Sequence, residues 1–321
     1  MIAPRISTAI PLHNEQEVLP ELLRRLTAVL DSQPGGPHEM VFADDGSRDG
    51  TLELLEKAAL ADPRIVIVVL SRNFGHSAAI SAALDAATGD VVVVMDGDLQ
   101  DAPEAIPQFL ALYAQGYDVV YAQRIKRKES WWLRACYFLA YRLIAFVSDV
   151  DVPLDSGDFG LLSRRAAAAL KALPERQRFL RGLRRWIGFP QIGLAIERDA
   201  RYAGATKYTL AKLIALALDG VFAFSTAPLR LAAVLGGATV LAGLSFFAYA
   251  LYVRLFVADG SPQGFTALIG ALVLLSGVQL LSLGVIGEYI GRIYEEVKGR
   301  PRYIVRRHIR GREQETPKFW A

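Results

Sequence analysis

The sequence predicts an α/β domain with a mostly parallel sheet, followed by a pair of helices that cross a membrane. In the first part of the chain, short apolar segments alternate with segments whose apolar residues recur at helical spacing. Residues 231–253 and 265–286 contain no charged side chain, and each is long enough to span the roughly 30 Å hydrocarbon core of a bilayer. The mean hydropathy of the 321-residue chain is +0.26, which is high for a soluble protein.

Composition narrows the classes of function. The chain has one cysteine, Cys136, which excludes an internal disulfide, and its four histidines lack the spacing of a zinc site. The net charge is +3, and no secretory signal precedes the first predicted strand. We therefore expect the amino-terminal part in the cytoplasm, with a membrane and not a nucleic acid as its partner, while a homo-oligomer is left open.

Strands and helices alternate from the first residues onward. The predicted strands are residues 5–12, 39–43, 65–70 and 91–95, with helices at 17–30, from 51 onward and within the alanine-rich segment 71–90. Four strands separated by helices form a doubly wound parallel sheet. Ligands of such sheets bind beyond the carboxyl ends of the strands, where the polar residues of this part of the chain cluster.

The middle of the chain is less regular. Its pattern predicts helices at 105–115 and 164–173 and strands at 118–122 and 193–198. We also expect an acidic turn-rich loop at 154–160, a buried or interfacial helix at 131–147 and an interfacial stretch at 210–224. Residues 175–190 combine five arginines with aromatic side chains. That composition favours contact with an anionic membrane surface.

Two acidic residues follow the fourth predicted strand. That strand, residues 91–95, contains no polar alternation, so we expect it to be covered on both faces. Asp96 and Asp98 come directly after it, with Gly97 between them. Two carboxylates one residue apart can hold Mg²⁺ or Mn²⁺, whose other ligands are water and phosphate oxygens. The segment therefore predicts a metal-bound diphosphate, although the same residues also suit an ordinary polar turn.

Four motifs in order resemble the family-two glycosyltransferases of GT-A fold. They are residues 10–15 (IPLHNE), 43–51 (ADDGSRDGT), 96–101 (DGDLQD) and 155–159 (DSGDF). The polyprenyl-phosphate branch, with the dolichol-phosphate mannose synthases and the bactoprenol glucosyltransferases, is the most similar. The resemblance extends through the helix pair to residues 287–292 (GEYIGR). It implies a nucleotide sugar as donor and a polyprenyl phosphate lipid as acceptor.

The resemblance also implies particular site residues. The implied metal ligands are Asp96, Asp98 and Gln100, the nucleotide-binding residues are Pro11, Asn14, Glu15, Asp44, Asp45 and Asp96, and the catalytic residues are Asp158, Arg124, Arg134, Arg201 and Lys207. From the residues alone, the acidic pair at 44–45 also fits a helix-capping turn, and each basic residue also fits a solvated surface charge. A polyprenyl phosphate is already an anion near neutral pH, because its second pKa is about 6. Asp158 then serves either as a base or in orienting the sugar.

Charge asymmetry predicts the topology. The expected organisation is a cytoplasmic GT-A domain with interfacial helices (1–228), two transmembrane helices (229–287) and a basic cytoplasmic tail (288–321). The tail carries nine lysines and arginines against five acids, whereas the link between the helices carries one of each. By the positive-inside rule, the tail and the catalytic domain lie on the cytoplasmic side. The resemblance implies that the membrane is a bacterial inner membrane.

These inferences predict inverting, metal-dependent transfer of a hexose to undecaprenyl phosphate at the cytoplasmic membrane face. Glucose from UDP-glucose is favoured because the bacterial glucosyl branch matches best, but no motif distinguishes glucose from mannose donors. One alternative is a processive polysaccharide synthase, whose Gln-x-x-Arg-Trp motif is incomplete here because Gly182 precedes Arg185 and Trp186 in place of the glutamine. Another is a membrane-tethered nucleotide-binding protein without catalysis.

Overall fold

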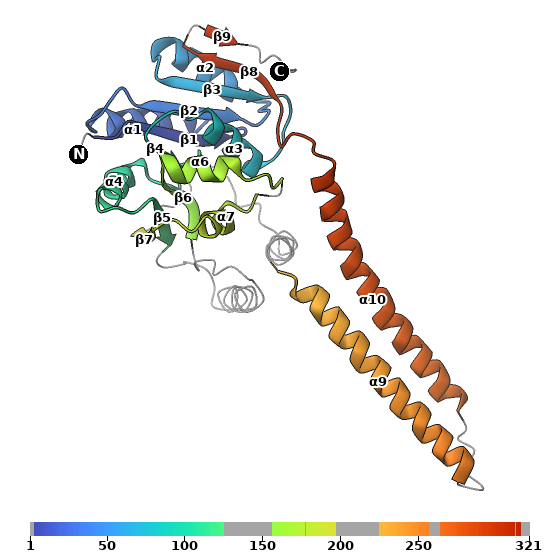
Figure 1. Ribbon diagram of the computed structural model, residues 1–321. Coiled ribbons are helices and arrows are strands. Elements are labelled where there is room, and N and C mark those ends of the chain that lie inside the picture. The colour runs from blue at the N-terminus through green and yellow to red at the C-terminus, as the bar shows by residue number, and fades with distance from the viewer. Residues whose placement is uncertain are drawn as a thin grey trace. The chain divides into compact units, whose positions relative to one another are not determined.

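The computed structural model describes residues 3–124, 156–176, 178–196, 225–256, 264–311 and 313–315 (Figure 1). Arg134, Arg201 and Lys207, which we assigned to the acceptor side, lie outside the described residues. The chain divides into two compact units, one containing the sheet and the other containing the two long helices.

One mixed sheet forms the core of the first unit. Within the described residues its strand order is β7-β5-β6-β4-β1-β2-β3-β8-β9. The strands are β1 (Ile6–Leu12), β2 (Glu39–Asp44), β3 (Ile65–Leu70), β4 (Val91–Val94), β5 (Val119–Arg124), β6 (Ser156–Ser163), β7 (Gln191–Ile196), β8 (Val305–Arg310) and β9 (Glu313–Glu315). The helices of this unit are α1 (Leu19–Asp31), α2 (Thr51–Ala61), α3 (His76–Ala86), α4 (Ile106–Ala114), α6 (Arg164–Ala172) and α7 (Leu180–Trp186), with a 3₁₀ turn at Pro103–Ala105.

The four strands predicted first form the parallel centre of the sheet. β1 pairs with β2 on one side and with β4 on the other, and β2 pairs with β3, all in parallel. Every residue of β1 to β4 is buried, which confirms that the Val91–Val94 strand is central. The chain moves outward in opposite directions from β1, so the carboxyl ends of β1 and β4 border the switch point where sheets of this kind bind ligands.

β6 is a strand where the sequence predicts an acidic loop over 154–160. It runs antiparallel to β4 on one side and to β5 on the other. A Cβ atom at Gly160 would lie 2.4 Å from the carbonyl oxygen of Val120, so the glycine that suggests a turn is required by close strand pairing. Pairing with two neighbours therefore outweighs the local turn preference of the segment.

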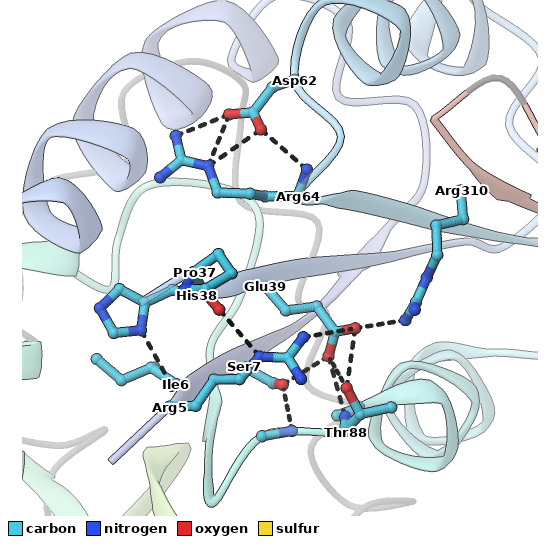
Figure 2. A network of polar contacts seen from close by, with 12 residues as sticks. Arg5, Ile6, Ser7, Pro37, His38, Glu39, Asp62, Arg64, Thr88 and Arg310 are labelled. Atoms are coloured by element: carbon cyan, nitrogen blue, oxygen red, sulfur yellow. Dashed lines mark hydrogen bonds and ion pairs between the residues drawn. The ribbon is translucent and has the colours of Figure 1, made fainter. Parts of the chain in front are cut away.

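The chain after the long helices returns to the sheet. β8 runs antiparallel to β3, and β9 pairs with β8. Ile309 of β8 is buried in the core, and Arg310 donates a 2.6 Å hydrogen bond to buried Glu39 at the start of β2 (Figure 2). The sequence analysis predicts no strand in this segment, because basic side chains dominate it and only tertiary pairing makes it a strand.

The second unit is a helical hairpin. α9 (Ala227–Phe256) and α10 (Phe265–Val297) run side by side in opposite directions (Figure 1). Their 30 and 33 residues correspond to about 45 and 50 Å of helix, longer than the roughly 30 Å hydrocarbon core. Apolar side chains such as Leu241, Phe247 and Leu280 are exposed along them. Both helices are long and apolar enough to cross a membrane.

Candidate active site

Asp45, directly after β2, is hydrogen-bonded to the residues just before α3. Its carboxylate accepts hydrogen bonds from the backbone N–H groups of Phe74 at 2.7 Å and Gly75 at 2.9 Å. Hydrogen bonds to an ionised acceptor are roughly twice as strong as neutral ones, and this carboxylate is buried. Asp45 therefore determines where the helix that follows Gly75 begins.

Asp44 is a buried carboxylate with long hydrogen bonds. Both of its oxygens lie 3.4 Å from the backbone nitrogen of Ser47. Burial raises the pKa of Asp44 above its usual value, and the hydrogen bonds from Ser47 oppose that change. Gly46 has a φ of +66°, and a Cβ there would lie 2.8 Å from the backbone nitrogen of Asn73. The turn therefore needs glycine, and Asp44 keeps the capacity to accept a hydrogen bond from a nucleoside.

The loop after β1 is tied to the loop after β2. Asn14, at a φ of +56°, donates its backbone N–H to the Ser47 hydroxyl at 3.0 Å and accepts from the Arg48 backbone at 2.8 Å through its side chain. The backbone N–H of Glu15 donates to the Thr51 hydroxyl at 2.9 Å. The first helix has no side-chain cap, so neither Asn14 nor Glu15 caps it through its side chain. They join the two loops that would surround a nucleoside.

The turn after β4 is packed against the end of β1. A Cβ atom on Gly97 would lie 2.3 Å from the Leu12 side chain and 3.1 Å from the carbonyl oxygen of Pro11, so glycine is needed for this close approach. The backbone N–H of Gln100 donates to the Asp98 carboxylate at 3.1 Å. Asp98 is 9 % exposed, and the turn itself sets the direction of its carboxylate.

The donor set at this turn fits a divalent cation that also binds a diphosphate. No group of three acidic, histidine or cysteine side chains is arranged to hold a metal within the part of the chain that the structure describes. Mg²⁺ and Mn²⁺ at phosphate sites need only one or two carboxylates, because water and phosphate oxygens supply the other ligands. Asp96 and Asp98 offer those carboxylates. The Asp96 carboxylate also lies 3.4 Å from Nε2 of His76, the first residue of α3.

Asp158 comes to the same end of the sheet from β6. The register of β6 against β4 pairs Gly160 with Val94, and continuing it past the end of β4 brings Asp158 opposite Asp96. Two arginines of α7 hold this part of β6. Arg181 faces the Asp158 carboxylate, and Arg184 donates to the Gly157 carbonyl oxygen at 2.8 Å.

The charge state of Asp158 follows from these neighbours. Burial alone would raise the pKa of Asp158, but the charges of Arg181 and Arg184 outweigh it and hold that pKa below its usual value. The charge that His76 carries when protonated lowers the pKa of Asp158 further. Burial also lowers the pKa of Arg184 to about 10, which still leaves the guanidinium charged at neutral pH. Asp158 is therefore an anion and a weak proton acceptor.

The arginine-rich segment faces the protein more than the sequence suggests. Arg178 is buried and donates through Nη2 to the carbonyl oxygens of Leu170 at 2.9 Å and Leu173 at 2.8 Å. Arg184 is also buried, and Arg181 pairs with Asp158. The interpretation of the whole segment as a membrane-binding surface is therefore wrong for these three arginines. Carbonyl oxygens and a carboxylate accept hydrogen bonds from these guanidinium groups in place of water.

Comparison with known proteins identifies the family. The family model described as "Glycosyl transferase family 2" matches residues 7–170, and the one described as "GtrB C-terminal hairpin" matches residues 227–293. The chain belongs to glycosyltransferase family 2. It is thus a glycosyltransferase, and the predicted GT-A fold with a carboxyl-terminal helix pair is confirmed.

Three similar family 2 proteins cover almost the whole chain. An uncharacterized glycosyltransferase, YkcC of Bacillus subtilis (strain 168), is 44% identical over 94% of this chain and 93% of its own. The SfII prophage-derived bactoprenol glucosyl transferase of Shigella flexneri is 37% identical over 96% of this chain and 99% of its own. An undecaprenyl-phosphate 4-deoxy-4-formamido-L-arabinose transferase of Pseudomonas paraeruginosa is 38% identical over 97% of this chain and 92% of its own.

The sequence analysis of this glycosyltransferase located the acidic residues but not their basic partners. Asp44, Asp45, Asp96 and Asp98 lie at or just after the carboxyl ends of β2 and β4, and β6 brings Asp158 to the same end of the sheet. Arg124 ends β5, and its side chain lies outside the described residues. Sequence reasoning missed His76, Arg181 and Arg184. The three-residue spacing of the two arginines could have placed them on one helix face.

Proposed function

We propose that this glycosyltransferase transfers a hexosyl group from a nucleoside diphosphate sugar to a polyprenyl phosphate at a membrane surface. The observation that carries the proposal is the gathering of Asp96, Asp98 and Asp158 at one end of the sheet, in a chain that also has two helices of membrane-spanning length. Two relatives with near-complete coverage are named for transfer to bactoprenol or undecaprenyl phosphate, which supports this class of acceptor.

The donor would occupy the carboxyl ends of β1, β2 and β4. Asp44 would accept hydrogen bonds from the base or ribose, while Asp45, Pro11, Asn14 and Glu15 would shape the walls of the nucleoside pocket. Asp96 would contact the donor from the neighbouring turn. The hydrogen bonds between the loops after β1 and β2 support this assignment, since they bring both loops to the same side of the sheet.

A divalent ion, Mg²⁺ or Mn²⁺, would be held by Asp96 and Asp98, with Gln100 beside them. When bound, it would supply positive charge that stabilises the departing nucleoside diphosphate. The chain itself contributes a fixed geometry, because Gly97 packs against β1 and the Gln100 backbone directs the Asp98 carboxylate.

The acceptor would react as a phosphate anion. One of its oxygens attacks the anomeric carbon, the bond from that carbon to the diphosphate breaks, and the nucleoside diphosphate leaves with a single inversion. No proton has to be removed from this nucleophile. The low pKa of Asp158 supports a role in orienting the sugar in preference to a role as base. Arg124, Arg134, Arg201 and Lys207 would bring the two anionic reactants together.

The identity of the sugar is the least constrained part of the proposal. Relatives with 37% and 38% identity are named for different sugars, glucose and 4-deoxy-4-formamido-L-arabinose, but for the same kind of lipid. Glucose from UDP-glucose is our first candidate, since the bacterial glucosyl branch best matches the motifs. We place the reaction at the cytoplasmic face of a bacterial inner membrane, where the basic residues after α10 would remain by the positive-inside rule.

The test is an assay of the purified full chain with undecaprenyl phosphate and a panel of radiolabelled nucleotide sugars. We expect one donor to give a lipid carrying a single sugar, and chelation of divalent ions to abolish the product. Growing polymer would support the processive synthase, and nucleotide binding without transfer to any acceptor would support the non-catalytic alternative.

Asp98→Asn tests the metal assignment. Removing one ligand charge should lower the rate on the order of a hundredfold or more. Asp90→Asn is the matched control, because Asp90 precedes the same strand at its other end and is exposed. An equal loss of transfer rate in Asp98→Asn and Asp90→Asn would contradict the assignment of Asp98 as a metal ligand.

A further inference from the structure

Arg181 forms an ion pair with the Asp158 carboxylate. Its Nε lies 3.3 Å from Oδ1 and its Nη2 lies 3.4 Å from Oδ2, so both oxygens face the same guanidinium edge. The side chains are 23 % and 19 % exposed, which shields the pair from bulk solvent but leaves the carboxylate accessible. A planar guanidinium that faces two oxygens defines the orientation of a carboxylate, which a lysine ammonium does not.

The backbone around Asp158 is held as firmly as its side chain. Arg184, one helical turn after Arg181, donates to the carbonyl oxygens of Gly157 at 2.8 Å and Asp158 at 3.4 Å. Phe159 points to the other face of the strand and packs against Phe109 of α4, with ring centroids 4.9 Å apart. The carboxylate is thus fixed by contacts on both faces of β6.

Stability alone does not explain this arrangement. A partly buried ion pair loses hydration, and this loss commonly cancels its electrostatic attraction, so such a pair is weak evidence for stabilisation. Apolar packing between α7 and β6 would hold the helix without this loss of hydration. What the pair does provide is a carboxylate with a fixed direction, opposite Asp96 in the extended register of the sheet.

We propose that Arg181 is a positioning residue: it fixes the Asp158 carboxylate, with Arg184 fixing the backbone beneath it, so that Asp158 accepts a hydrogen bond from a hydroxyl of the donor sugar. This inference rests on the proposed glycosyl transfer. Arg181 acts through Asp158 and does not itself contact the lipid phosphate. Loss of either partner should therefore cause the same defect, and loss of both should cause no more than loss of Asp158.

A double-mutant cycle with the full-length protein in detergent tests this role. We measure kcat and both KM values for wild type, Arg181→Gln, Asp158→Asn and the double variant. Arg181→Gln should lower kcat on the order of tenfold to a hundredfold, the usual cost of a small misplacement at a reacting centre, with the KM for polyprenyl phosphate unchanged. The double variant should match Asp158→Asn, and Arg181→Lys should regain part of kcat. Independent effects would instead multiply, because their free energies add.

A matched control separates positioning from folding. Arg165 contacts both oxygens of buried Asp118 near the other end of β6, so Arg165→Gln removes a comparable ion pair away from the site. It should keep kcat even if it lowers the melting temperature. Calorimetric measurement of UDP binding checks that each variant is folded. If Arg181→Gln is not folded, Arg181→Lys takes its place in the double-mutant cycle.

Several outcomes would overturn the inference and leave the glycosyl transfer intact. They are multiplicative losses in the double variant, wild-type kcat in Arg181→Gln, or a raised KM for polyprenyl phosphate at unchanged kcat, which would make Arg181 a phosphate ligand. A wild-type protein that transfers no sugar to polyprenyl phosphate would refute the proposed function, and this inference with it.

Discussion

Replacing Arg310 by glutamine should loosen the attachment of β8 to the sheet. The side chain of Glu39 is 3 % exposed and accepts hydrogen bonds from the Ser7 hydroxyl at 2.6 Å and the Thr88 backbone at 2.9 Å, in addition to Arg310 at 2.6 Å (Figure 2). Arg5 lies 3.8 Å from the oxygen that Arg310 contacts. The variant therefore removes the nearer of two positive charges from a buried carboxylate.

The size of the effect follows from these contacts. A hydrogen bond to a charged group contributes about 1.5–3 kcal/mol. Arg310 is 47 % exposed, and Arg5 remains as a partner, so we expect the lower part of that range, about 1–2 kcal/mol. For a domain of this size, that loss lowers the melting temperature by about 2–8 °C. Glu39→Gln should cost at least as much, because it removes the charge on which every partner converges.

Differential scanning fluorimetry of the full-length protein in detergent measures these shifts. Arg306→Gln is the control, since Arg306 lies on the same strand and is exposed. Its melting temperature should stay close to that of the wild type, because exposed substitutions change stability by about 0.5 kcal/mol or less. The reasoning fails if Arg310→Gln and Arg306→Gln have the same melting temperature.

Three further predictions test charge, topology and the acceptor side. Hydrogen bonds from Arg165 hold the pKa of Asp118 below its usual value, so at this group the folded state binds fewer protons than the unfolded state. The contribution of Asp118 to thermal stability should be fully present above about pH 4 and be lost as the pH drops through the folded pKa. In Arg165→Gln, the melting temperature should fall less over the same pH range. Reporters fused after Ala321 and inserted at Gly260 should lie on opposite sides of the membrane, and a shared side would refute the hairpin. Lys207→Ala should still bind donor nucleotide while transfer to lipid phosphate drops on the order of a hundredfold, and wild-type transfer would remove the residue from the acceptor site.

The parallel centre of the sheet was readable from the sequence because local and global preferences agree there. β1 to β4 are apolar segments between amphipathic helices, and every residue in them is buried. The leucines of α1 that recur at helical spacing, at 19, 22, 26 and 30, are the ones the structure buries. The acidic residues at the strand ends were predictable for the same reason, since the order of strands and turns determines their position.

Elements that depend on distant partners were not readable in this way. β6 contains two glycines and an aspartate, and β8 is mainly basic, so neither segment has the apolar alternation that signals a strand. Each becomes a strand because neighbours far away in sequence supply its hydrogen bonds. Arg181 and Arg184 were assigned to a membrane surface on composition, because composition alone does not show that Asp158 and two carbonyl oxygens lie opposite them.

The return of β8 to the sheet sets an order of events during synthesis. β8 begins 235 residues after β3 ends, and the whole helical hairpin lies between them. At about 5–20 residues per second, a ribosome needs roughly 12–47 s to make that stretch. During this time the outer edge of β3 has no partner strand, and unpaired edges of this kind invite pairing with other chains. A nascent chain therefore completes its catalytic sheet only after both hairpin helices have been made, which couples maturation of the enzyme to delivery of the hairpin.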